Sequence, residues 1–300
     1  MPSLQDYTQQ SSYSDPREYT PLVAALPADL PSLGAAVRNV LVHYRASGIE
    51  FTPDRLAEID SRWIDRLLAA DRSRFDTPLD QPRPEAERVA GCCRDFTLLT
   101  VSALRAHGVP ARSRIGFAGY FEPDFHDDHV ITEFWDGERW VFADTQIASA
   151  GSWPGFNPLD MPLDEAGFST AAQVWTAYRN GKIDVNKYGV GLGVPIGGDW
   201  FVRNYVVLEL AHRQRDELLL WDLWGSMSDQ LNGDLGLIDE VAALLLAADA
   251  GDQSAEARLA DRYATDERLQ PGDRVLCRSL RGVTNAVDLR HRAPVEPSTG

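Results

Sequence analysis

The residue types best suited to chemistry lie between residues 91 and 145. Cys92 and Cys93 follow Gly91, and His129 and Asp144 stand further along the chain. A cysteine thiolate is a nucleophile, and an imidazole exchanges a proton near neutral pH. A carboxylate can hold that imidazole in one tautomer. These residue types suit acyl transfer through a thioester.

Cys93 is expected at the N-terminus of a helix. Apolar residues recur at helical spacing from Phe96 to Leu104, and the run 107–110, with the sequence His-Gly-Val-Pro, ends the pattern. The unpaired N–H groups and the positive end of the helix dipole stabilise a thiolate at this position. The backbone N–H of Cys93 is also suited to an oxyanion hole.

His129 and Asp144 are expected to face each other across a β-hairpin. Residues 111–120 and 130–143 are rich in β-branched and aromatic side chains, which predicts strands. Asp136-Gly137 suits the two central positions of a type I′ turn. With that turn, the numbers of paired residues sum to 273, so His129 pairs with Asp144. Their Cβ atoms would lie roughly 4.5 to 5.5 Å apart, close enough for a hydrogen bond.

These residues resemble the core motif of the transglutaminase-like superfamily of papain-type cysteine enzymes. The similar blocks are 91–97, 104–112, 129–135 and 139–145, in the family's order. The resemblance implies that Cys93 is the nucleophile, His129 the general base and Asp144 the residue that orients it. It implies that no cofactor is needed, and no metal ligand is assigned among these residues. The flanks, 1–88 and 147–300, match nothing in the core motif and resemble parts of bacterial members, so the resemblance leaves the substrate open.

Three positions depart from the family pattern. Cys92 precedes the nucleophile, Ile131 stands where a tryptophan is frequent, and 144–146 is Asp-Thr-Gln where the family often has Asp-Pro-Thr. None of these departures removes a catalytic group. The doubled cysteine leaves either thiol as the reactive one, although the Gly-x-Cys-x-Asp spacing favours Cys93. Cys277 is expected to be inert.

The order of the elements, helices then sheet then helices, predicts an α+β fold with helical flanks. The resemblance implies a papain-like core, in which the helix that carries Cys93 packs on an antiparallel sheet. Helices are expected over 33–46, from a cap at Thr52 to Leu67, and over 170–180, 199–213 and 235–248. A short strand is expected over 275–277. The expected division is a polar tail or surface strap at 1–30, a helical part at 31–88, the core at 89–150, a mainly helical part at 151–292 and a tail at 293–300.

Composition excludes several classes of protein. The chain has 300 residues, 44% of them hydrophobic and 25% charged, as in ordinary globular proteins. A net charge of −16 disfavours nucleic acid and anionic membranes as partners. No apolar run is long enough for a membrane helix, and the first 20 residues lack the features of a signal peptide. The three cysteines are expected to be free thiols. Together with the absence of these two features, they predict a cytoplasmic protein.

The predicted activity is therefore that of a cysteine hydrolase or acyltransferase acting on a small-molecule or peptide amide or thioester. Hydrolysis and amide transfer use the same residues and remain alternatives; a calcium-regulated crosslinker is disfavoured because no calcium-loop motif is present. A non-catalytic scaffold, with flanking helices blocking the cleft, is a second alternative. The sequence carries no indication of oligomeric state.

Other residues have plainer interpretations. A metal site at 126–129, using His126 and His129, is the third alternative. Asp95 and Glu133 are expected either to support the site or to be solvated. Four histidines are expected to be structural or solvated, and three tryptophans are expected in the core more readily than in a cleft: His43, His107, His212 and His291, and Trp200, Trp221 and Trp224.

Overall fold

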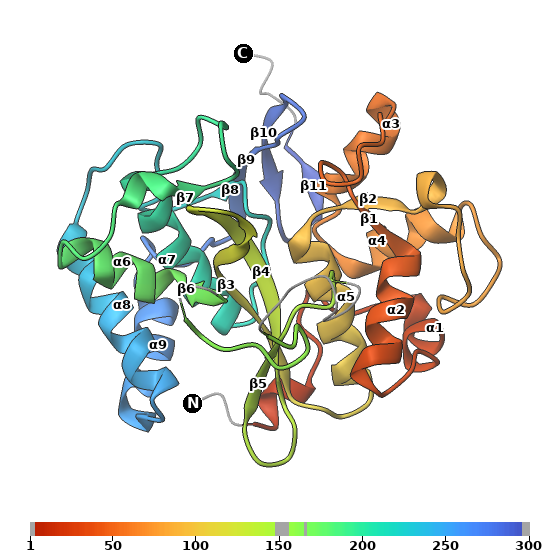
Figure 1. Cartoon of the computed structure of the whole chain (residues 1–300), viewed down its shortest axis with the longest axis horizontal. Helices are drawn as coiled ribbons and strands as arrows, with labels where there is room; N and C mark the ends of the chain where they lie inside the picture. The colour runs from red at the N-terminus through yellow and green to blue at the C-terminus, as the bar shows by residue number, and fades with distance from the viewer. Residues whose placement is uncertain (1–3, 148–155, 165–166, 296–300) are drawn as a thin grey trace.

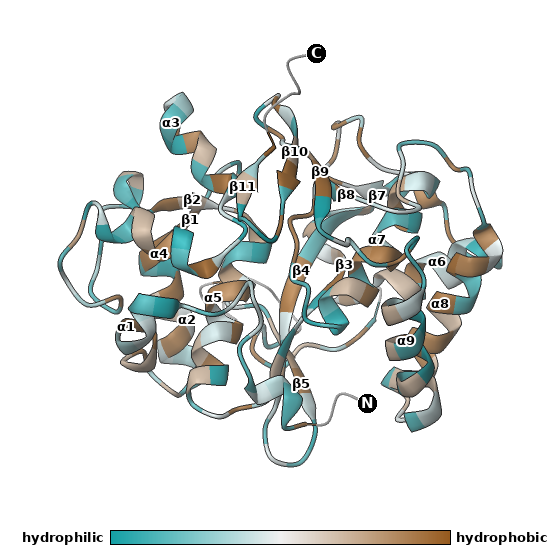
Figure 2. Cartoon of the chain, turned by 180° about the vertical axis from the view of Figure 1, so that it is seen from behind, coloured by the Kyte–Doolittle hydropathy of each residue, from teal (hydrophilic) through white to brown (hydrophobic). Residues whose placement is uncertain are grey.

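The computed structural model describes residues 4–147, 156–164 and 167–295. A central sheet stands between two groups of helices, and a smaller sheet lies above them (Figure 1). Hydrophobic residues are frequent in the central sheet and in the helix beside it, while the outer helices carry both hydrophobic and hydrophilic residues (Figure 2). No helix within the described ranges is long and apolar enough to cross a membrane. The fold is α+β, as the sequence predicts.

The central sheet has the strand order β5-β4-β3-β6, and β7 pairs with β4. All neighbours in the order are antiparallel, whereas β7 runs parallel to β4. The strands are β3 Ala111–Glu122, β4 Phe125–Trp135, β5 Trp140–Ala143, β6 Phe168–Thr170 and β7 Tyr188–Gly189. β5 pairs with residues 132–135 of β4, and β7 pairs with residues 126–127. His129 lies between these two pairings.

The predicted hairpin is present, but its register differs by two residues. Trp135 pairs with Trp140, so paired numbers sum to 275. The loop has four residues because Asp136 Oδ1 accepts hydrogen bonds from the backbone N–H of Glu138 at 2.8 Å and of Arg139 at 2.9 Å. This side-chain turn replaces the two-residue type I′ turn that we expected. Asp144 consequently lies diagonal to His129, just beyond the end of β5.

Helix α5 Cys93–Ala106 begins and ends close to the predicted positions. Its N-cap is Cys92, whose backbone is extended with φ −121° and ψ −178°. Asp95 Oδ2 accepts a hydrogen bond from the backbone N–H of Cys92 at 2.9 Å, which is half of a capping box. Asp95 is therefore buried and holds the start of the helix. It is not a solvated acid.

The segment before α5 differs from the expected pair of long helices. The structure has α2 Leu30–Val40, α3 Pro53–Leu56, a 3-10 helix Ala57–Asp60 and α4 Ile64–Arg72. Thr52 caps α3 as expected. Residues 41–43, expected to be helical, instead form β1 Leu41–His43, which pairs in parallel with β2 Val89–Gly91. This pairing with a distant strand ends α2 at Val40, well before Gly48.

Residues 4–30 are packed into the molecule and do not form a loose tail. They contain short helical turns at Asp6–Thr8 and Arg17–Tyr19 and the helix α1 Thr20–Ala24. Tyr7 and Tyr13 are each 3% exposed. Ser14 accepts a hydrogen bond at its carbonyl oxygen from Ser102 Oγ on α5, at 2.7 Å. The N-terminal segment thus supports the helix that carries Cys93.

The C-terminal half is helical, as expected, but it also contains a second sheet. Its helices are α6 Ala171–Arg179, α7 Asp199–Arg213, α8 Leu235–Asp249 and α9 Gln253–Thr265. The second sheet has the order β11-β10-β9-β8. Its strands are β8 Asp222–Leu223, β9 Arg274–Arg278, β10 Thr284–Asp288 and β11 Ala293–Pro294. The expected strand at 275–277 lies within β9. Parts of the expected loop at 151–162 and of the tail at 293–300 fall outside the described residues.

Candidate active site

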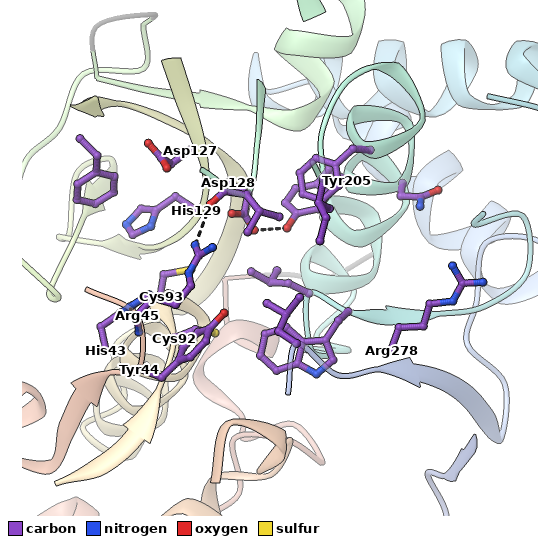
Figure 3. A pocket seen from close by; sticks show the side chains of 18 of the residues that line it. His43, Tyr44, Arg45, Cys92, Cys93, Asp127, Asp128, His129, Tyr205 and Arg278 are labelled. Carbon is purple, nitrogen blue, oxygen red and sulfur yellow. Dashed lines mark hydrogen bonds between the residues drawn. The ribbon is translucent and has the colours of Figure 1, made fainter. Parts of the chain in front are cut away.

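Cys93 is the first residue of α5 and lines a cavity of about 630 Å³. Only 5% of Cys93 is exposed, and the cavity provides access to its thiol. His129 lines the same cavity. Figure 3 shows Cys93, Cys92 and His43 grouped on one wall, with Arg278 at the opposite end. The flanking helices leave this cavity open. A non-catalytic scaffold whose cleft is blocked by those helices was one alternative, and the open cavity does not fit it.

His129 contacts both Asp144 and Cys93. Its Nε2 lies 2.7 Å from Asp144 Oδ2. His129 also interacts with the Cys93 thiol, through its charge and through a hydrogen bond that lowers the pKa of Cys93. His129 and Asp144 are each 2% exposed, so water competes little for these bonds. The structure therefore brings together the three residues that the sequence singled out.

The charges of this group favour a thiolate and an imidazolium. A hydrogen bond from Cys92 lowers the pKa of Cys93; burial opposes this shift, and the charge of His129 lowers the pKa further. For His129, burial lowers the pKa, but the charges of Asp144 and Cys93 outweigh it and raise the pKa to about 10. The pKa of Asp144 is lowered because the interaction with His129 outweighs burial. The ion pair is the expected state at neutral pH.

Tyr120 is a member of the site that the sequence analysis missed. Its Oη donates a hydrogen bond to Asp144 Oδ2 at 2.8 Å. Asp144 Oδ1 accepts another hydrogen bond, from the backbone N–H of Gln146 at 2.9 Å. Both carboxylate oxygens are thus bonded, which holds Asp144 in place and ionised.

A β-bulge explains how Tyr120 reaches this position. The register of β3 on β4 shifts between Ala118 and Glu122. Tyr120 and its neighbour Phe121 both contact the His129 ring, with ring centroids 6.0 and 5.0 Å from it. Adjacent residues of a regular strand point to opposite faces, so only an irregular strand lets both reach one histidine. A strand pattern in the sequence does not reveal such a bulge.

The other two cysteines are unlike Cys93. The hydrogen bond to Cys93 and burial raise the pKa of Cys92, so this residue is the thiol donor of the adjacent pair. Burial raises the pKa of Cys277 to about 11, and Cys277 lies on β9, outside the residues that line the cavity. The structure therefore favours Cys93 as the ionised thiol.

The cavity beside the thiol is lined by both apolar and charged residues. Trp200 and Trp221 line it, whereas Trp224 is core and donates from Nε1 to the carbonyl of Leu269 at 2.8 Å. The expectation that the tryptophans belong to the core thus holds for Trp221 and Trp224, which are 7% and 6% exposed, although Trp221 also lines the cavity. Trp200 is only partly buried and lines the cavity. The other apolar lining residues are Ala46, Phe121, Val190, Ile196, Phe201, Leu220, Leu223, Met227 and Leu280. The charged lining residues are Arg45, Glu122, Asp127, Asp128, Asp229 and Arg278.

The run 126–129 does not form a metal site. His126 stacks on Tyr188 with ring centroids 4.3 Å apart, while His129 is bonded to Asp144. Asp128 accepts a hydrogen bond from Tyr205. Among the described residues, no group of three or more His, Cys, Asp or Glu side chains could hold a metal ion. The metal alternative has no structural support.

Glu133 and most of the remaining histidines lie away from the cavity. Glu133 is buried with Arg112 and Arg114 and does not support the thiol. His107 bonds the carbonyl of Leu26, His212 is buried against Ser113, and His291 is exposed. His43 is the exception, because it lines the cavity beside Cys93. No spacing in the sequence joins His43 to a motif 50 residues later.

Comparison with known families agrees with the resemblance in the sequence. Residues 60–145 match the model of the transglutaminase-like superfamily, so this part of the chain is a transglutaminase-like domain. The match begins upstream of the 89–150 core that the sequence predicted and includes α4. The predicted resemblance to this superfamily is therefore confirmed over residues 60–145.

A solved structure of a protein from Cytophaga hutchinsonii, provisionally named a cysteine protease, is also similar. The two chains are 18% identical with a TM-score of 0.32, and the similarity covers 51% of this chain and 45% of that one. The present chain thus spans less than half the length of that protein. No curated protein shows significant sequence similarity to this chain.

Proposed function

We propose that this protein is a cysteine-dependent acyl-transfer enzyme. Cys93 would be the nucleophile, His129 the general acid and base, and Asp144 the residue that orients His129. The observation that carries the proposal is the position of His129, bonded to Asp144 at 2.7 Å on one side and to Cys93 on the other. A nucleophile, a base and an orienting group in contact are the signature of covalent catalysis.

The reaction would proceed in two steps. The Cys93 thiolate adds to the carbonyl carbon of an amide or thioester, and the carbonyl π electrons move to oxygen. When the intermediate collapses, the bond to the leaving group breaks, and His129 gives that group its proton. The acyl group is then a thioester on Cys93. Water or an amine, deprotonated by His129, attacks the thioester and releases the thiolate.

The cavity supports a substrate with an apolar group next to the scissile carbonyl. Trp200, Phe201 and Trp221 line the cavity, and an aromatic or aliphatic group packed against them would lose contact with water. We propose small-molecule or peptide acyl donors, with hydrolysis or small-molecule amide transfer as the outcome. The three free, buried cysteines support a cytoplasmic location as part of this proposal.

Alkylation by iodoacetamide tests the proposal at each of the three cysteines, read by peptide mass spectrometry. The alkylation rate of Cys93 should change little between about pH 6 and 8, whereas that of an ordinary thiol rises roughly tenfold per pH unit. The pH dependence is the diagnostic quantity, because a thiol of low pKa is also a weaker nucleophile. Cys277 provides an internal reference.

Two variants connect the thiol to its partners. In His129→Ala and Asp144→Asn, the pH dependence of Cys93 alkylation should move toward that of an ordinary thiol. Acylation of Cys93 by p-nitrophenyl acetate, followed by mass spectrometry, should fall by on the order of 10³-fold or more. If wild-type Cys93 is alkylated like an ordinary thiol and the substitution of His129 does not change its rate, a non-catalytic binding role is the better explanation. Product masses with water or an added amine separate hydrolysis from amide transfer.

A further inference from the structure

His43 is a polar group of the cavity that the proposed mechanism does not yet use. It ends strand β1, and its Cα partner across the parallel pairing with β2 is Gly91. The backbone N–H of Tyr44 continues this pairing with a 3.0 Å hydrogen bond to the carbonyl of Gly91. Because Gly91 is two residues before Cys93, the pairing places the His43 ring beside the thiol (Figure 3).

The backbone around His43 fixes its tautomer. The N–H of Ala46 donates to His43 Nδ1 at 3.1 Å, and the N–H of Arg45 does so at 3.3 Å. A nitrogen that accepts hydrogen bonds carries no proton, so the proton of the neutral ring is on Nε2. The ring also stacks on Tyr44, with centroids 5.4 Å apart, which limits its rotation.

The ring is uncharged at neutral pH. Burial lowers the pKa of His43 to about 4, although a thiolate at Cys93 acts in the opposite direction. A neutral imidazole cannot replace His129 as the proton carrier of the ion pair. It can donate one hydrogen bond through a fixed N–H, which is what a developing oxyanion requires.

We propose that His43 Nε2–H, together with the backbone N–H of Cys93, forms the oxyanion hole of this enzyme. The N–H of Cys93 is the first of α5, and the first N–H groups of a helix have no partner within it. As the thiolate adds to the carbonyl, the oxygen gains the electron pair and accepts both hydrogen bonds. No proton moves from His43. The bonds relax when the leaving group departs with the proton of His129.

This inference rests on the proposed acyl-transfer function. Two reactions of the same thiol test the inference and the proposed function separately. Alkylation by iodoacetamide needs a thiolate but forms no oxyanion, whereas acylation by p-nitrophenyl acetate passes through a tetrahedral oxyanion. A residue of the oxyanion hole therefore affects acylation alone. A residue that supports the thiolate or the fold affects both reactions.

The matched variants are His43→Asn and His43→Gln. The Gln side-chain amide can place its N–H near the position of Nε2, whereas the Asn amide ends near Nδ1. We expect His43→Asn to slow acylation of Cys93 by on the order of 10²-fold and to leave alkylation within about threefold of wild type. His43→Gln should recover much of the lost acylation. His291→Asn, at an exposed histidine outside the cavity, is the control.

The possible outcomes are distinct. Equal losses in acylation and alkylation, or unchanged acylation in His43→Asn, would overturn the assignment of His43 while leaving the nucleophile intact. A wild-type Cys93 without an activated thiol would overturn the proposed function itself. In wild-type protein, ¹⁵N NMR of the histidine rings should show His43 as the neutral Nε2–H tautomer near pH 7. A charged ring or the Nδ1–H tautomer would exclude the assignment even where a variant fails to fold.

Discussion

Thr97 donates a hydrogen bond from its hydroxyl to the backbone carbonyl of Val130, with 2.9 Å between the oxygens. Thr97 lies one turn after Cys93 on the same face of α5. Val130 follows His129 on β4, between the stretches of β4 that pair with β5 and β7. This single bond thus fixes the helix to the strand next to both reactive groups.

Thr97→Val should loosen this connection at nearly constant volume. The buried carbonyl of Val130 would lose a donor, which costs about 1 to 3 kcal/mol of unfolding free energy. The alkylation rate of Cys93 should also become more pH-dependent, because the thiol is held less closely to His129. Urea unfolding and the alkylation profile measure the two effects.

Thr132→Val is the matched control on the same strand. Thr132 is fully buried, and its hydroxyl oxygen has no hydrogen-bond partner among the described residues. Removing this hydroxyl should leave the stability unchanged or increase it. Equal losses in both variants would mean that the Thr97 bond has no special part in holding the site.

The ion pair predicts a maximum of stability near neutral pH. His129 has a folded pKa of about 10, above its unfolded value of roughly 6.5, so its contribution is full below about 6.5 and is lost as pH rises toward 10. The Cys93 pKa is lowered on folding, so its contribution is full above the unfolded value of roughly 8.5 and is lost as pH falls. Between roughly pH 6.5 and 8.5 the two dependences largely cancel.

The difference in unfolding free energy between wild type and the double variant Cys93→Ala/His129→Gln isolates this contribution. We expect the difference to be greatest between about pH 6.5 and 8.5 and to shrink on either side. Denaturant titrations at a series of pH values provide the measurement. A difference that does not change with pH would show that the two groups are neutral in the folded protein.

Tyr120→Phe should weaken the site without abolishing it. The change removes one hydrogen bond to Asp144 Oδ2, while His129 and the N–H of Gln146 still contact the carboxylate. A hydrogen bond to a charged group contributes about 1.5 to 3 kcal/mol, so acylation of Cys93 should fall by on the order of tenfold. Tyr178→Phe, whose hydroxyl is 3.5 Å from Asp199, is the control. Equal rates in both variants would exclude a role for Tyr120.

Gly116 pairs with His129 on one side and with Thr170 on the other. A Cβ at this position would lie 2.1 Å from the carbonyl oxygen of Ser169, so β6 would have to move away. Gly116→Ala should therefore lower the unfolding free energy by on the order of 3 kcal/mol. In Gly236→Ala, the new Cβ meets only Asp234 Oδ1, at 3.2 Å, and stability should change little. Thermal unfolding compares the two.

The contact between His129 and Asp144 was predicted from the wrong hairpin register. We expected a two-residue turn, and the structure has a four-residue loop that shifts the pairing by two positions. Side chains alternate between the faces of a strand with a period of two, so this shift keeps both residues on one face. A shift of one residue would have separated them.

Local sequence signals determined the positions of several helices, the family and the three residues of the site. Helical spacing and end signals located α5 and α7 because these depend on residues close in the chain. The motif from Gly91 to Thr145 indicated the family and the three residues of the site. Each of these features can be recognised within a short stretch of sequence.

Only the tertiary structure decided which further residues join Cys93, His129 and Asp144 in the site. The strand at 41–43 exists because it pairs with residues 89–91, and that pairing brings His43 to Cys93. A bulge in β3 turns Tyr120 toward Asp144. These contacts depend on long-range pairing and on irregular backbone, and neither leaves a periodic pattern in the sequence. The sequence thus indicated the reactive groups, whereas the folded chain selected the residues that hold them.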